Sequence, residues 1–217
     1  MADTSLLKNF NATCGGGLVL NKDVYDMQPG EALQLINFEP STEGGYRRLN
    51  GTTKYNSTIV PQVSLANERI QMSAIFNDKI IVARGGTVSY GDTSGSWTSL
   101  ATSQGGTYTY DFDKFNFSGT SKIIIATGEA AAFTVNTSFA VDVINATGGG
   151  TAPTNPKFVK TFANHVFYGG MSNSTHSILF SVPFSEDNFT SGSGAGEIKV
   201  GDVVTGLKVF RDELFIF

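Results

Sequence analysis

The segment AIFNDKIIVARGG, residues 74–86, joins a phenylalanine, a short polar turn, an apolar run and a pair of glycines. Related segments begin at Asn116 (NFSGTSKIIIATG), Lys160 (KTFANHVFYGG) and Lys208 (KVFRDELFIF). Their leading phenylalanines stand at positions 76, 117, 162 and 210, after intervals of 41, 45 and 48 residues. Short apolar runs bounded by Gly, Asn, Ser and Thr predict strands and turns. We therefore expect an all-β fold.

The repeat also has a characteristic length. A second strand is expected after each Gly-containing turn, and units of roughly 40–50 residues with about four short strands are typical of propeller blades. We expect β-propeller-like blades; a β-sandwich with coincidental spacing is the alternative. Phe76, Phe162 and Phe210 are expected to be buried at equivalent positions. Six aromatic residues are assigned to structural positions of the repeat: Phe76, Trp97, Phe117, Phe162, Phe189 and Phe210.

The composition changes near residue 60. Residues 1–60 contain Gly15-Gly16-Gly17 and are expected to form an extended N-terminal arm and clasp. Residues 61–217 are expected to form the blade domain. Its last repeat stops at Phe217 in mid-strand, and four Phe-led starts make at most three complete blades. We therefore expect either that the sequence is the N-terminal part of a longer chain or that partner subunits supply the rest.

The charge balance argues against a nucleic-acid clamp. Fifteen basic and 19 acidic residues give a net charge of −4, whereas phosphate binding needs clustered cations. No run approaches the roughly 18 apolar residues of a membrane helix, so no membrane span is expected.

Residues that could perform catalysis are sparse. Cys14 is the only cysteine, and His165 and His176 are the only histidines. No H-E-x-x-H zinc motif, G-x-S-x-G elbow or P-loop is present. We expect no catalytic residue, no cofactor and no metal site, and we expect that the protein is not an enzyme.

One turn resembles a known propeller motif. SYGDTSGSW, residues 89–97, is similar to the Asp-box turn of sialidase-like propellers, although its spacing is off by one or two residues. The Asp box is structural in those enzymes, so we expect a blade turn with Trp97 packed between blades. SVPFSEDNF, residues 181–189, is interpreted as a counterpart with Phe189 in the Trp role.

Two sets of side chains keep a carbohydrate function open. Five aromatic residues expected in turns could stack on sugars: Tyr90, Trp97, Tyr108, Tyr110 and Phe112. Four acidic residues are also expected in turns and in contact with solvent: Asp111, Asp113, Glu186 and Asp187. Such acids do not by themselves establish a glycosidase pair. The alternative function is therefore a carbohydrate-binding or sialidase-like propeller module for receptor recognition.

The N-terminal elements have an unusual order: Gly16-Gly17-Leu18, then PGEA from Pro29, LINF from Leu35 and GYRRLNG from Gly45. In this order they resemble the start of tailed-bacteriophage virion proteins of the tail-nozzle (tail tubular) and DNA-stabilisation type. The segments VFYGG at Val166 and LFSVPFSEDNF at Leu179 are similar to segments of these proteins as well. The resemblance covers roughly the first 50 residues and, more loosely, the repeats. Family members are usually far longer than this chain.

The resemblance implies a structural protein of the virion tail. Such a protein lies in a ring below the portal and adaptor, continues the DNA channel and anchors fibres or spikes. The implied partners are the portal/adaptor ring, tail fibres or spikes and copies of the chain itself, while genomic DNA passes without sequence-specific binding. The implied location is the virion tail and, during assembly, the host cytoplasm.

The apolar side chains of residues 1–30 follow no periodic core face. Ordering such a segment costs about 1–2 kcal/mol per residue, which a neighbouring subunit would offset by burying these side chains. We expect residues 1–30 to be extended in the assembly and mobile in the isolated protein. The candidate interface residues are Leu6, Leu7, Phe10, Leu18, Leu20, Tyr25, Arg47 and Arg48.

Overall fold

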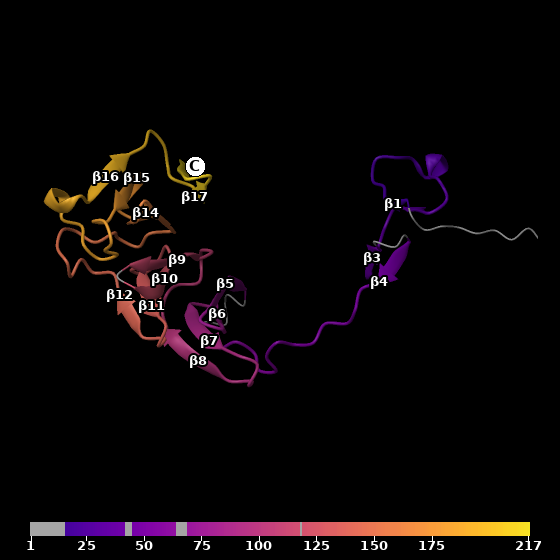
Figure 1. The fold of residues 1–217 in the computed structure, drawn as a ribbon, viewed down its shortest axis with the longest axis horizontal. Coiled ribbons are helices and arrows are strands. Elements are labelled where there is room, and N and C mark those ends of the chain that lie inside the picture. The colour runs from indigo at the N-terminus through magenta and orange to yellow at the C-terminus, as the bar shows by residue number, and fades with distance from the viewer. Residues whose placement is uncertain (1–15, 42–44, 64–68, 118) are drawn as a thin grey trace, which may run out of the picture. The chain divides into compact units, whose positions relative to one another are not determined.

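The computed structural model describes residues 16–41, 45–63, 69–117 and 119–217. These residues form short strands and two short 3-10 helices, so the expected all-β class is confirmed. The chain divides into two compact units, one ending at Lys54 and the other running from Tyr55 to Phe217 (Figure 1). None of the helices in the described residues is long and apolar enough to cross a membrane.

The N-terminal unit contains two small sheets. The strands β1 (Gly17–Leu18) and β2 (Glu31–Ala32) pair in parallel, and β3 (Phe38–Pro40) and β4 (Tyr46–Arg48) pair antiparallel. A 3-10 helix, η2 (Val24–Asp26), lies between β1 and β2. Because β1 pairs with β2, the chain between them closes a loop. The extension expected for residues 1–30 concerns the assembly and stays a prediction.

The second unit contains three four-stranded antiparallel sheets and a final hairpin. Sheet 1 consists of β5 (Ile70–Phe76), β6 (Lys79–Arg84), β7 (Thr87–Gly91) and β8 (Trp97–Ala101). Sheet 2 consists of β9 (Asp111–Phe117), β10 (Thr120–Ala126), β11 (Phe133–Asn136) and β12 (Val141–Val143). Sheet 3 consists of β13 (Phe158–Phe162), β14 (His165–Met171), β15 (Ser174–Phe180) and β16 (Gly196–Lys199), with the 3-10 helix η3 (Ser191–Ser193) before β16. The hairpin consists of β17 (Leu207–Phe210) and β18 (Glu213–Ile216).

The four leading phenylalanines occupy one topological position. Each is the last residue of the first strand, and each pairs across a two-residue turn with the first residue of the next strand. The turn residues Asn77 and Asp78 have φ angles of 45° and 60°, and Arg211 and Asp212 have 50° and 58°. Positive φ at both central residues gives a turn that matches the right-handed twist of a hairpin. The sequence repeat therefore corresponds to a repeat of structure.

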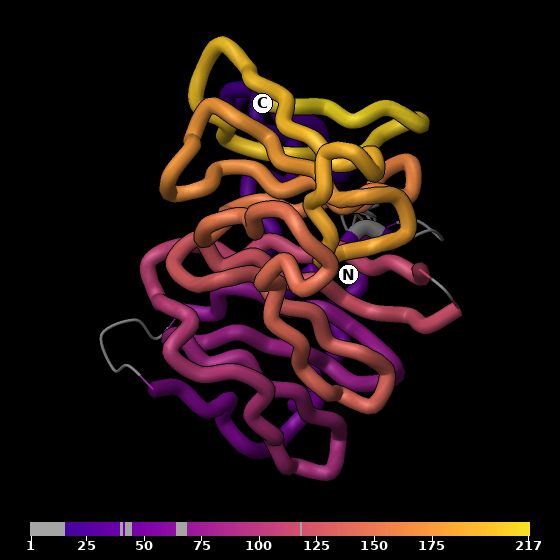
Figure 2. Tube along the Cα trace, turned by 90° about the vertical axis from the view of Figure 1, so that its left-hand side faces the viewer, coloured from indigo at the N-terminus to yellow at the C-terminus, as the bar shows by residue number. Residues whose placement is uncertain are grey.

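Successive sheets stack through apolar clusters, and the coloured tube of Figure 2 runs in chain order from its magenta part to its yellow end. The first cluster joins sheets 1 and 2, the second joins sheets 2 and 3, and the third joins sheet 3 to the hairpin. The central strand β10 shows the principle. Ile123 and Ile125 face the first cluster, whereas Ile124 and Ala126 face the second. Alternate side chains of a strand point to opposite faces, so the continuous apolar run belongs to a sheet buried on both sides.

The burial of the phenylalanines differs along the series. Phe76 is 6% exposed, Phe162 is half-buried and Phe210 is 56% exposed. The expectation of burial is therefore confirmed for Phe76 only. Phe162 is half-buried, and Phe210 is exposed because in the described residues no further sheet covers the outer face of the hairpin. The sheets are separate meanders, and none of those described closes on itself.

Candidate functional site

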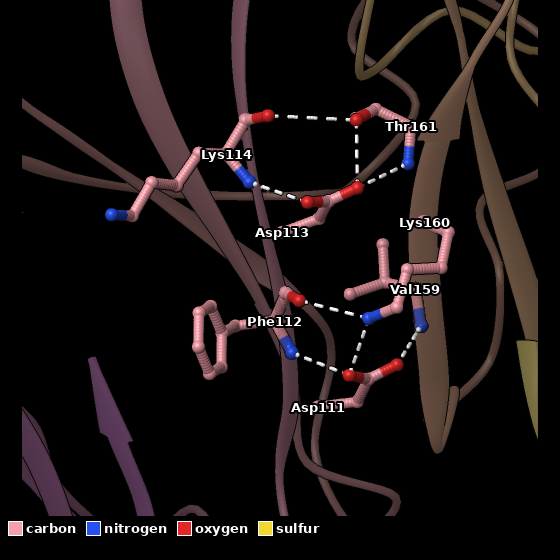
Figure 3. Close-up of polar contacts among 7 residues, drawn as sticks. All are labelled: Asp111, Phe112, Asp113, Lys114, Val159, Lys160 and Thr161. Atoms are coloured by element: carbon pink, nitrogen blue, oxygen red, sulfur yellow. Dashed lines mark hydrogen bonds and ion pairs between the residues drawn. The ribbon is translucent and has the colours of Figure 1, made fainter. Parts of the chain in front are cut away.

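A pair of carboxylates joins the first strands of sheets 2 and 3 (Figure 3). Asp111 Oδ2 accepts the backbone N–H of Val159 at 3.0 Å, and Asp113 Oδ2 accepts that of Thr161 at 2.7 Å. The other oxygen of each carboxylate accepts an N–H of its own strand, from Phe112 for Asp111 and from Lys114 for Asp113, both at 2.9 Å. Each carboxylate thus bridges two strand edges.

The register explains why acids are needed at this junction. Phe162 pairs with His165 across a two-residue turn, so Val159 and Thr161 direct their N–H groups away from β14. A sheet edge with unpaired donors needs acceptors when it is covered. Asp111 and Asp113, two residues apart on one strand, match the spacing of these donors. Both had been expected in solvated turns; this expectation is wrong, because both lie on β9 and act as acceptors.

Lys160 completes this carboxylate bridge. Its ammonium lies 2.6 Å from Asp111 Oδ1 and donates to the carbonyl of Phe112 at 2.9 Å. The Lys160 and Asp111 side chains are only 14% and 26% exposed. The ammonium of Lys160 therefore neutralises the carboxylate of Asp111 inside the junction. It also serves as the hydrogen-bond donor for the Phe112 carbonyl of the same strand.

Another acidic side chain, Asp187, joins a loop of sheet 2 to a loop of sheet 3. The carboxylate of Asp187 accepts three successive backbone N–H groups, from Asn145, Ala146 and Thr147, at 2.6–2.9 Å. Successive N–H groups that converge in this way form an anion-binding nest. The neighbouring Glu186 pairs with Lys122 of β10. Both acids therefore hold adjacent sheets together.

The Asp-box-like turn is structural as well. Asp92 Oδ1 accepts the N–H of Ser94 at 2.8 Å, and Asp92 Oδ2 lies 3.3 Å from the Lys79 ammonium. Hydrogen bonds from Ser94, together with Lys79, lower the pKa of Asp92 to about 2. Trp97 begins β8 and lies against Gly91 of its own sheet, and its indole N–H donates to the carbonyl of Thr58. The expected packing of Trp97 between blades is not what these contacts show.

Phe189 is not a counterpart of Trp97. It lies in the second apolar cluster, with its ring centroid 5.7 Å from that of Tyr168. The 3-10 helix η3 lies between Phe189 and the next strand, β16. Trp97, in contrast, is the first residue of its strand. The two segments therefore differ in local structure.

The aromatic residues considered for sugar stacking are engaged in the fold. Tyr90 stacks on Phe139 with centroids 4.1 Å apart. Tyr110 belongs to the first cluster and Phe112 packs against it, while the Lys157 ammonium covers the ring of Tyr108. Three of the five lie in strands, contrary to the expectation of turns: Tyr90, Trp97 and Phe112.

Each of the two histidines has a polar neighbour. His165 Nδ1 lies 2.6 Å from the carbonyl of Ser181, and His176 Nδ1 lies 3.0 Å from the Thr175 hydroxyl. Among the residues that the structure describes, no group of three or more His, Cys, Asp and Glu side chains could hold a metal ion. Cys14 lies outside those residues.

The candidate interface residues fall into two groups. Leu6, Leu7 and Phe10 lie outside the described residues. The other five lie in the N-terminal unit: Leu18, Leu20, Tyr25, Arg47 and Arg48. Leu20 is 78% exposed and Tyr25 is 96% exposed. The Arg47 Nε lies 2.6 Å from Glu39 Oε1 across the β3–β4 pair, and Arg48 is exposed.

No described residue of this unit with an assigned burial is buried. Sequence analysis missed further apolar residues that the unit exposes: Val24, Leu33, Ile36, Phe38 and Leu49. The sequence around these residues does not alternate between apolar and polar positions. This lack of alternation indicates that the short strands have no buried face, and it could have identified these residues as exposed. Neither a protein-family model nor a curated protein sequence matches the chain.

Proposed function

We propose that the protein is a non-enzymatic structural component of a phage tail, in the nozzle or tail ring below the portal and adaptor. The observation that supports this most directly is the N-terminal unit, whose large apolar side chains are exposed on short strands. Two-stranded sheets without a buried face have little stability of their own. A protein surface that covers them would supply the missing core.

The second unit supports a scaffold role. Its acids and aromatic residues hold successive sheets together, as the bridge at Asp111 and Asp113 does. We propose that the sheets are propeller-like blades whose loops anchor fibres or spikes. A net charge of −4 suits a channel protein, because a strongly basic wall would retain DNA.

The test is assembly with isolated portal-adaptor rings, followed by negative-stain microscopy. The proposal predicts an added ring of density and copies of the chain in a closed oligomer. The paired change Leu20→Asp and Tyr25→Asp should abolish the added ring, whereas Val141→Asp, at an exposed position of β12, should leave it unchanged. A chain that neither oligomerises nor binds the rings would rule out this function.

A groove favours a second candidate function. It has a volume of about 610 Å³, and both polar and apolar side chains line it, among them Asn77, Asp78, Lys114 and Asn116 beside the exposed Ile75. Amides, carboxylates and one apolar patch are groups that can bind a saccharide. A glycan-array screen distinguishes the two functions: binding that Asn116→Ala abolishes would favour a receptor-binding module.

A further inference from the structure

The segment that leads into sheet 1, residues 55–63, is here called the strap. Three hydrogen bonds attach it to sheet 1 or its turn. Trp97 Nε1 donates to the carbonyl of Thr58 at 2.9 Å, and Arg84 Nη1 donates to that of Val60 at 2.9 Å. Asn56 Nδ2 donates to the carbonyl of Asp92 at 2.8 Å. Each of these bonds joins a side chain to a backbone carbonyl, in contrast to the apolar contacts between successive sheets.

The strap lies on the side of sheet 1 that faces away from sheet 2. In the β6–β7 ladder Arg84 pairs with Thr87 and Val82 pairs with Ser89, so these four side chains share one face. The alternate residues of β6, Ile81 and Ala83, belong to the first apolar cluster on the opposite face. Arg84, which holds the strap, therefore marks the outer face.

This outer face contains buried polar atoms without a protein partner in the described part of the chain. Thr87 is 2% exposed and Ser89 is fully buried, yet Thr87 Oγ1 and Ser89 Oγ have no hydrogen-bond partner. In the strap, Gln62 Oε1 is also buried and unpartnered. Arg84, the cross-strand partner of Thr87, binds the carbonyl two residues before Gln62. The strap and the outer face of sheet 1 thus each contain buried oxygens without a partner in the described residues.

We propose that ordered water molecules bind between the strap and sheet 1, with Thr87, Ser89 and Gln62 as their protein partners. A buried hydroxyl without a partner carries a desolvation penalty, and buried waters typically bond to two to four such groups. With this water layer, the strap covers the outer face of sheet 1 in the place where another sheet could pack.

The test is the sign of a stability change in the full chain. Thr87→Val keeps the side-chain shape and removes the hydroxyl. If the hydroxyl binds water, the change leaves that water with one partner fewer, and the melting temperature should fall by about 2–4 °C. The matched control is Thr127→Val, because the buried Thr127 hydroxyl is bonded to the backbone of Ala130. This control should also lower the melting temperature.

An unchanged or raised melting temperature for Thr87→Val, with the control lowered, would overturn the proposal, because it would show that the hydroxyl has no partner to lose. A crystal structure gives a second readout. Ordered water should lie about 2.5–3.0 Å from Thr87 Oγ1 and should bridge to Ser89 or the strap. A dry contact at this site would also overturn the proposal.

Discussion

Asp111 and Val159 belong to neighbouring sheets, and the carboxylate of the first accepts the backbone N–H of the second at 3.0 Å. Asp113 and Thr161 repeat the contact two residues further along each strand. Two first strands, each paired on one side only, are thus connected by side chains in place of a β-ladder. The stability of this junction therefore depends on the acceptor oxygens of two acidic side chains.

Asp113→Asn should destabilise the protein by about 1–3 kcal/mol. The amide can present its single oxygen to Lys114 or to Thr161 but not to both, and its NH₂ group then faces a donor. Urea unfolding followed by fluorescence measures the loss. Asp142→Asn, at an exposed position of β12, is the control and should change stability by less than about 0.5 kcal/mol. Equal effects of the two substitutions would contradict the bridging role.

The four phenylalanines should contribute differently to the free energy of unfolding, although they occupy the same topological position. Phe76→Ala should cost about 3–5 kcal/mol, because its side chain is buried in the first cluster. Phe210→Ala should cost less than about 1 kcal/mol, because its ring is mostly exposed. Thermal unfolding of the two variants under one condition gives the comparison. A large loss for Phe210→Ala would mean that this ring is buried in solution.

Acid should weaken the β7–β8 turn. The pKa of Asp92 is lowered from 3.8 to about 2 by hydrogen bonds from Ser94 and by Lys79. A lowered folded-state pKa gives stability that is present above pH 4 and is lost as the pH falls towards 2. The protection factors of the turn amides, which are corrected for the intrinsic pH dependence of exchange, should therefore fall over this interval, and Asp92→Asn should remove the dependence. A carboxyl titration with its midpoint near 4 in the folded protein would contradict this prediction.

Alkali should act on Tyr168. Burial, together with Glu186 and Asp187, raises the pKa of its phenol well above 10, and its hydroxyl donates to the carbonyl of Glu186 at 2.8 Å. A raised folded-state pKa means that the phenol stabilises the fold below pH 10 and that this contribution is lost at higher pH. Absorbance of phenolate should show Tyr168 titrating only on unfolding. Tyr168→Phe should cost about 0.5–1.5 kcal/mol at neutral pH.

The repeat was predictable because its signals are local. A phenylalanine, two turn residues and an apolar strand each depend on neighbours in sequence, and all four copies occupy one position in their hairpins. The role of Asp111 and Asp113 was not predicted, because acids are depleted in strands. The alternation in DFDKFNF was the available signal for β9. The donors that these acids serve lie 48 residues away and follow only from the packing of two sheets.

The strap bears on the order in which the stacked sheets of the second unit can fold. The first sheet acquires a cover from residues that precede it in the chain, whereas its other face is completed by residues that follow. During synthesis, N-terminal segments emerge first and begin to fold first. Each new meander would then cover the open face of the sheet before it. Folding of this unit would then proceed in chain order, from sheet 1 towards the β17–β18 hairpin.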